Sequence, residues 1–279
     1  MALGSGALEA ATTGNSCVAI GADALDVATT SVSSIGIGSQ ALGSLTTGHY
    51  NTAIGDSALT SQVDKQSSTA VGKGALDAAN SDNCTAVGVD ALGAVTTGAN
   101  NVSIGAYAGS AVTTGANNIF LGRDAGLTAS PGGNITTASN EIGFGDENIS
   151  AANIQVDWTI ASDKRDKTDV SPLDLGLEFI NQLEPVTYRW DKRSKYGDDQ
   201  SIIPDGTHKE EQLEGGLLAQ DVEVIENQYG YQQSDKTNLI TKLSEDGKMY
   251  GIKYSKLVPM LIKAVQELSA EVEELKKEK

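Results

Sequence analysis

The stretch Ala53-Ile54-Gly55-Asp56-Ser57-Ala58-Leu59 decides the fold of the first half of the chain, because close versions of it recur at a fixed distance. The spacing between copies is 17 residues, with one interval of 16. A repeat this short has no room for two packed helices, so each copy is predicted to form a short strand or two and a turn. The glycines that mark the eight copies are Gly4, Gly21, Gly38, Gly55, Gly72, Gly88, Gly105 and Gly122.

The segments between the copies support this prediction. Thr-Thr-Gly and Asn-Asn pairs supply turn chemistry. One copy cannot bury its thin apolar stripe alone, so a continuous core requires either stacked copies of one chain or three chains wound around an axis. We therefore predict a mainly β shaft over residues 1–126, either a β-solenoid or a trimeric β-roll. Small residues in the stripe, Ala and Gly far more than Leu or Phe, indicate closely spaced backbones.

The repeat resembles the head repeats of trimeric autotransporter adhesins and the shaft repeats of phage fibres, over about residues 2–126. This resemblance implies either a passive shaft or a surface that binds host glycans. Glycan binding would be supported by aromatic platforms, and before residue 130 the chain offers only Tyr50, Tyr107 and Phe120. We therefore assign binding of a host-surface receptor, a glycan by class, to the fibre as a whole and to no site in the shaft.

The two cysteines, Cys17 and Cys84, hold equivalent positions four repeats apart, each four residues before a repeat glycine. That separation excludes a disulfide between them if the repeats stack evenly. They are predicted to be small buried side chains. Two cysteines and the distant His49 and His208 do not form a metal site, and we expect neither a metal nor a cofactor.

Residues 127–161 break the period and are predicted to cap the shaft. Pro131-Gly132-Gly133-Asn134 has the composition of a turn, and residues 140–145 resemble a degenerate last repeat. Apolar residues then alternate at 154, 156, 158 and 160. This alternation predicts a strand over residues 152–160, directly before the next segment.

Composition and charge pattern change across Ile160-Ala161-Ser162-Asp163-Lys164-Arg165-Asp166-Lys167. A serine followed five residues later by a lysine can be a nucleophile and its general base. The spacing alone carries little weight, because many soluble proteins contain such pairs. The alternative is a polar turn after a strand.

Four segments beginning at this serine resemble, in order, the S74 peptidase family, the C-terminal intramolecular chaperone domains of phage tail fibres, tailspikes and neck appendages. The resemblance implies that residues 162–279 drive trimerisation and folding of the fibre and then cut themselves off. It implies a scissile bond between Ala161 and Ser162, with Ser162 as the nucleophile and Lys167 as its base. The resemblance covers essentially residues 158–279, and its segments are 162–170, 183–190, 216–222 and 254–268.

In this mechanism the Ser162 hydroxyl attacks the carbonyl carbon of Ala161, and water hydrolyses the resulting ester. Attack on another chain of the trimer is the alternative. A lysine base must be partly neutral, whereas lysine ordinarily titrates near pH ~10.4. Burial and the two neighbouring cations would lower the pKa of Lys167, and the two neighbouring carboxylates would raise it. We therefore expect assembly of the trimer to switch on a single cut per chain.

The segment after the serine mixes helices and strands without βαβ order, which predicts an α+β domain. Ser171 and Pro172 have the pattern of a helix start, and Pro185 ends that helix. The remaining predicted elements are a strand over 186–190, a polar stretch over 192–214, a strand over 215–219, a short helix over 220–227, and a hairpin of 239–243 with 249–254.

The chain closes on a helix over residues 255–279 whose apolar residues alternate at intervals of three and four. This spacing is typical of a coiled coil. Valine at a with leucine at d favours two strands, whereas the family resemblance implies three, and we predict a trimer. The alternative is a helix that packs on its own domain. The seam consists of Val258, Leu261, Val265, Leu268, Val272 and Leu275.

The chain is acidic, with a formal net charge of -17. This charge disfavours nucleic acid and anionic membrane surfaces as partners. The sequence contains no run of about 18 apolar residues, so no membrane insertion is expected. Since Met1 is followed at once by the middle of a repeat, we expect the chain to be part of a longer fibre.

We interpret the chain as the C-terminal part of a homotrimeric phage tail fibre or tailspike, assembled in the host cytoplasm and carried in the virion. Its C-terminal domain is predicted to be a self-cleaving serine peptidase. The alternative is a trimeric adhesin whose C-terminal domain only caps or anchors the trimer without catalysis.

Overall fold

The computed structural model describes residues 1–13, 16–128, 130–197 and 201–278. These form two compact units. The first contains residues 1–149 together with the short segment 244–249, and the second contains residues 150–243 and 250–279. Each unit is described by itself below.

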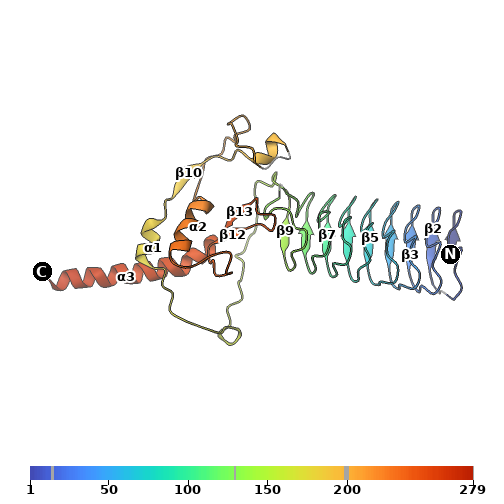
Figure 1. Ribbon diagram of the computed structural model, residues 1–279, viewed down its shortest axis with the longest axis horizontal. Helices are drawn as coiled ribbons and strands as arrows, with labels where there is room; N and C mark the ends of the chain where they lie inside the picture. The colour runs from blue at the N-terminus through green and yellow to red at the C-terminus, as the bar shows by residue number, and fades with distance from the viewer. Residues whose placement is uncertain (14–15, 129, 198–200, 279) are drawn as a thin grey trace. The chain divides into compact units, whose positions relative to one another are not determined.

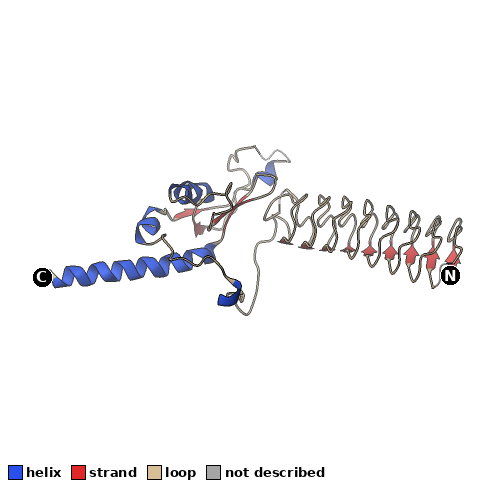
Figure 2. Cartoon of the chain, turned by 60° about the horizontal axis from the view of Figure 1, so that its bottom comes forward, coloured by secondary structure: helices blue, strands red, loops and turns tan. Residues whose placement is uncertain are grey.

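The first unit is a β-solenoid, and its described residues form nine parallel strands that pair in chain order (Figure 1). The strands follow one another along one side of the coil (Figure 2), and turns form the rest of each rung. The predicted β-solenoid is confirmed. The strands are β1 (Ala2–Leu3), β2 (Val18–Ile20), β3 (Ile35–Ile37), β4 (Thr52–Ile54), β5 (Thr69–Val71), β6 (Thr85–Val87), β7 (Val102–Ile104), β8 (Ile119–Leu121) and β9 (Ile142–Phe144).

The strand register repeats the sequence period. Val18 pairs with Ile35 and Thr52 with Thr69, each 17 residues along. The 16-residue interval keeps the register, because Thr69 pairs with Thr85 and the missing residue is lost from a turn. Between β8 and β9 the spacing rises to 23, as the pairing of Ile119 with Ile142 shows. The interruption after residue 126 is therefore an insertion in a turn, and the predicted last repeat is a true rung.

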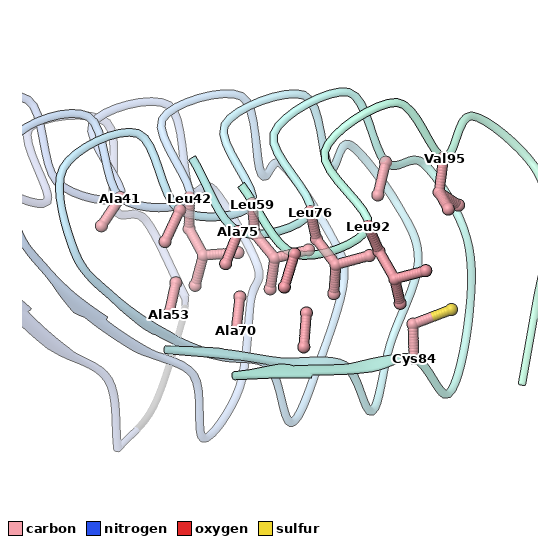
Figure 3. Packing of buried hydrophobic residues seen from close by; sticks show 14 of the residues in the cluster. Ala41, Leu42, Ala53, Leu59, Ala70, Ala75, Leu76, Cys84, Leu92 and Val95 are labelled. Atoms are coloured by element: carbon pink, nitrogen blue, oxygen red, sulfur yellow. The ribbon is translucent and has the colours of Figure 1, made fainter. Parts of the chain in front are cut away.

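The motif Ala53–Leu59 explains the core. Ala53, the middle residue of β4, points inward and is fully buried, as are Ala58 and Leu59 across the coil. Ile54 points outward and is 39% exposed. Equivalent Ala and Leu residues stack along the interior in Figure 3. Stacked copies of one chain therefore bury the interior of the shaft. Of the two arrangements that the sequence left open for this core, stacked copies or three wound chains, the structure shows the first.

One inward position carries polar side chains instead. Six of the seven side chains donate hydrogen bonds to backbone carbonyls further along the chain, as Asn101 Nδ2 does to Gly115 O at 2.8 Å and Cys84 Sγ to Gly98 O at 3.3 Å. In the seventh, Ser34 Oγ accepts from Ser31 Oγ and Asn51 N. Both cysteines are free and buried, as predicted, and lie 67 residues apart in this row rather than in the apolar one. The row consists of Cys17, Ser34, Asn51, Ser68, Cys84, Asn101 and Asn118.

The second unit is a small α+β region, as predicted. Its described residues form two antiparallel strand pairs, three helices and three short 3-10 turns. The polar stretch after β10 forms a 3-10 turn, η2, and residues 198–200 of it lie outside the described residues. The elements are η1 (Lys164–Asp166), α1 (Leu177–Gln182), β10 (Val186–Tyr188), η2 (Arg193–Tyr196), β11 (Glu214–Gly216), α2 (Ala219–Gln228), β12 (Thr241–Leu243), β13 (Tyr250–Ile252), η3 (Tyr254–Lys256) and α3 (Leu257–Lys277).

Two sequence predictions in this region are wrong. The strand predicted over 152–160 does not form: these residues make no ladder with any described strand, and Val156 and Trp158 are each 73% exposed. An alternating pattern cannot form a strand without a hydrogen-bonding neighbour. The helix predicted from Ser171 starts only at Leu177, because its first amide is capped from elsewhere: Leu177 N donates to Glu267 Oε2 at 2.7 Å.

The C-terminal helix forms as predicted and has two different apolar faces. Met260 and Ala264 are buried within the unit, where α3 packs against α1. The six seam residues from Val258 to Leu275 lie on another face and are between 40% and 65% exposed. The helix thus packs on its own domain through one face and leaves the predicted coiled-coil seam open. Among the residues described, we find no helix with the length and apolar character of a membrane span.

Candidate active site

The serine and lysine singled out by the sequence lie next to each other. Lys167 Nζ donates to Ser162 Oγ at 2.6 Å. The intervening residues form the 3-10 turn η1, in which Asp166 N donates to Asp163 O and Lys167 N to Lys164 O. This turn folds the chain back on itself and brings together two side chains that an extended chain would hold far apart.

Asp163 stabilises that turn as its N-cap. Its carboxylate accepts from Arg165 N at 2.9 Å and forms a fork with the Arg165 guanidinium, Nη2 to Oδ2, at 2.6 Å. The hydrogen bonds from Arg165 lower the pKa of Asp163, and the same pairing raises the pKa of Arg165. One of the two neighbouring cations and one of the two neighbouring carboxylates therefore neutralise each other.

Water reaches the whole segment in the single chain. Ala161, Ser162 and Lys167 are all exposed, so the burial that the sequence argument expects around the lysine does not come from this chain. An exposed ammonium is well solvated and is a poor general base. A catalytic role for the pair would therefore need further surface to cover it.

The other segments of the family resemblance meet in the second unit. Val186 of β10 pairs with Gly216 of β11, and Leu217 N donates to Tyr254 Oη at 2.9 Å. A side chain at Gly216 would meet that hydroxyl, because an added Cβ would lie 2.6 Å from it. Segments 183–190, 216–222 and 254–268, far apart in the sequence, are thus parts of one folded region.

The comparison with protein families covers three of the four segments of the resemblance, and segment 254–268 lies outside the matched residues. Residues 162–231, a quarter of the chain, match the Peptidase_S74 model, described as chaperone of endosialidase. The chain therefore fits a tail-fibre fragment with an S74 chaperone domain. The S74 match begins at Ser162, the residue the sequence analysis takes as its nucleophile. A search of curated proteins and a search of solved structures found no match.

The S74 chaperone domain is linked in its family to self-cleaving chaperones, and together with the β-solenoid it supports a role like that of a phage fibre or tailspike. Among the described residues, no group of three or more His, Cys, Asp and Glu side chains is placed to hold a metal ion.

Sequence reasoning missed two carboxylates that organise the region. Glu226 is fully buried on α2, and its oxygens accept from the backbone amides of Leu239, Ile240 and Thr241 at 2.7 to 3.0 Å. Glu245, at the hairpin tip, also accepts several backbone amides. Neither glutamate stands out in the sequence, because neither belongs to a repeat. The hydrogen-bond partners of the Glu226 carboxylate begin 13 residues away, and those of the Glu245 carboxylate lie up to 109 residues away.

Proposed function

We propose that the chain is the C-terminal part of a phage tail fibre or tailspike whose S74 chaperone domain drives trimerisation and folding and then releases itself by a cut between Ala161 and Ser162. The contact between Lys167 Nζ and Ser162 Oγ at the first residue of the S74 match carries this proposal. The family and the solenoid also support a place in the virion.

The proposed reaction uses groups of this chain and one water molecule. Neutral Lys167 takes the proton of the Ser162 hydroxyl, and Oγ forms a bond to the carbonyl carbon of Ala161 through a five-membered ring. The bond from that carbon to Ser162 N then breaks, and the nitrogen takes up the proton from Lys167. Water hydrolyses the ester, which leaves a carboxylate on Ala161 and a free amine on Ser162. Attack on a neighbouring chain is the alternative route.

The trimer would supply the burial that the single chain lacks. Covering Lys167 favours its neutral form, and excluding bulk water strengthens the contact with Ser162. This coupling would delay the cut until three chains have assembled.

Two apolar surfaces support the trimer. The first is the open seam of α3 from Val258 to Leu275. The second is the outer face of the solenoid sheet, where β-branched and other apolar side chains succeed one another from turn to turn, exposed at Leu3, Ile54, Val87, Ile104 and Phe144. Continuous exposed apolar surfaces of this kind mark association sites. A second copy of the chain presents the same surfaces in the same order.

The cut is tested by intact-mass spectrometry of purified variants. The parent chain should yield fragments 1–161 and 162–279, the second beginning Ser-Asp-Lys-Arg. Ser162→Ala and Lys167→Ala should remain whole, and Lys167→Arg should stay almost uncut as pH rises, because guanidinium remains protonated. Lys164→Ala is the matched control and should be cut. Cutting at another bond, or undiminished cutting of Ser162→Ala, would contradict the mechanism.

A second candidate is a trimeric adhesin whose C-terminal domain caps or anchors the trimer without catalysis. The exposure of Ser162 and Lys167 to solvent favours it. A denaturing gel of the purified chain separates the two functions: one band at full length supports the adhesin, and two bands support the self-cleaving chaperone.

A further inference from the structure

Several turns of the solenoid are joined to the next by threonines at one repeated position, which we call the threonine ladder; Val63 and Asn80 take this position in two other turns. In each of five turns a threonine donates both its backbone amide and its side-chain hydroxyl to one carbonyl oxygen of the following turn. Thr113, for example, donates to Thr136 O at 2.8 Å from N and 3.2 Å from Oγ1. The threonines that repeat this pattern are Thr12, Thr29, Thr46, Thr96 and Thr113.

The ladder reaches its end at Thr136. The carbonyl of Thr136 accepts the bonds of Thr113, but among the described residues no further solenoid turn offers a carbonyl to the amide and hydroxyl of Thr136. The amides of Thr136, Thr137 and Ala138 all face the open end. Unpaired backbone amides are costly when shielded from water and are templates for unwanted strand pairing when exposed.

Glu245 accepts these bonds. Its carboxylate accepts hydrogen bonds from the amide and the hydroxyl of Thr136, at 2.9 and 3.1 Å. Every earlier threonine of the ladder donates the same two groups to a backbone carbonyl. It also accepts the amides of Thr137 and Ala138 at 3.0 and 3.1 Å, and the Thr137 hydroxyl. Two carboxylate oxygens thus satisfy five donors at the end of the shaft.

The hairpin tip holds Glu245 ready for this contact. Ser244 N donates to Met249 O at 2.8 Å, and Gly247 N to Ser244 O at 3.0 Å, which closes a tight turn around the glutamate. Ser244 also lies against Gly133, where an added Cβ would come within 2.6 Å of the Ser244 Cβ. The glycine in the insertion after β8 therefore leaves the space that the tip fills. Segment 244–249 belongs to the same compact unit as the shaft.

We infer that the tip of the β12–β13 hairpin is the end cap of the solenoid, in which the carboxylate of Glu245 takes the place of the carbonyl of a further turn. Only a completed last turn presents these donors together, so the tip recognises the finished end of the shaft. The end surface is thus a binding site for a carboxylate on a tight turn, and its occupant is the chain's own residue 245. This inference needs neither the cut nor the trimer.

Hydrogen exchange followed by mass spectrometry tests the cap. The full chain should carry Ser162→Ala in every sample, so that the result does not depend on whether the chain cuts itself. Glu245→Ala should speed exchange of the amides of Thr136, Thr137 and Ala138, read in peptides spanning residues 135–140, by about tenfold or more, since each of these three amides loses a charge-assisted bond. Glu245→Gln keeps the size and should speed it less. Glu9→Gln, the same charge change in the first turn, is the matched control and should leave these peptides unchanged.

The site of the effect decides the inference. Faster exchange confined to the last turn in both Glu245 variants supports the cap. Unchanged exchange at 135–140, or the same acceleration in Glu9→Gln, overturns it. If Glu245→Ala fails to fold, the Glu245→Gln chain decides by the same criteria.

Discussion

At the scale of single residues, both the backbone conformation and the close approach of the next turn require glycine at the repeat position. Gly55 has φ +139°, a conformation that other residues adopt only with strain. A Cβ at this position would also lie 2.5 Å from the carbonyl oxygen of Gly72 in the next turn. The same stacking continues glycine on glycine along the shaft. The period of these glycines is one of the observations, with the turn residues and the apolar stripe, that predict a β-solenoid or a trimeric β-roll.

Replacing one of these glycines should therefore weaken the shaft. Gly55→Ala should lower the free energy of unfolding by about 2 kcal/mol or more, because both the strained backbone and the contact with Gly72 oppose a methyl group. Asp56→Ala, an exposed neighbour, should change it by less than about 0.5 kcal/mol. Urea unfolding followed by circular dichroism measures the free energy of unfolding of both variants. Equal values would show that the backbone around residue 55 adjusts to a methyl group at little cost.

Sequence reasoning found Ser162 and Lys167 because a family resemblance pointed to them, and the 3-10 turn that joins them is local. It did not find Glu245 or Glu226. Their partners lie up to 109 residues away, and an isolated glutamate in a charged stretch looks like any solvated side chain. Long-range carboxylate caps of this kind become visible only when the fold brings the amides together.

At the scale of elements, the same limit explains the first helix of the second unit. Ser171 and Pro172 have the local pattern of a helix start, yet α1 begins at Leu177. The amide of Leu177 is capped by Glu267 from α3, and Glu267 is itself held by Lys263 at the preceding turn. A cap supplied 90 residues later overrides the local one. The strand predicted at 152–160 does not form for a related reason. Its residues alternate as in a strand, but no described strand lies beside them to accept and donate the ladder hydrogen bonds.

The cap at Glu245 predicts a pH dependence. Burial alone would raise the pKa of this carboxyl, but hydrogen bonds from Thr137 and from three backbone amides outweigh it and lower the pKa from 4.5 to about 2. A lowered pKa means that the stabilisation is fully present above pH 4.5 and is lost as pH falls toward 2. Glu245→Gln should therefore cost about 1 kcal/mol at neutral pH, a value reduced by solvent screening, and progressively less below pH 4.5.

Unfolding in urea between pH 7 and pH 2.5 measures this difference. Glu9→Gln should track the parent chain at every pH. A constant gap between the parent chain and Glu245→Gln down to pH 2.5 would show that the carboxylate is not the group that titrates.

At the scale of the whole molecule, the helix seam should control assembly. The double variant Leu261→Asp, Leu268→Asp places charge at two exposed apolar seam positions and should leave little trimer, because a trimer would bury those charges. Gln266→Asp with Ala270→Asp adds the same charges on exposed positions outside the seam and should assemble normally. Light scattering reports the mass against the 28.9 kDa of one chain. Normal assembly of the seam variant would mean that α3 serves only its own domain.

The shaft should also need the C-terminal domain in order to fold. The solenoid buries its core within one chain, yet its last turn depends on residue 245 and its outer apolar face is open. Residues 1–161 expressed alone therefore lack the cap and the helix seam during folding, when exposed strand edges are most prone to aggregate. We expect this fragment to be insoluble when expressed alone.

The same residues should stay folded once they have matured in the full chain. Stacked rungs in an assembled shaft come apart slowly, so removal of the C-terminal part after folding should leave a stable product. The test compares 1–161 expressed alone with 1–161 released from the mature chain, by solubility and by light scattering. A well-behaved trimer from direct expression would show that residues 162–279 are dispensable for folding, and loss of the released shaft to aggregation would show that they are needed throughout.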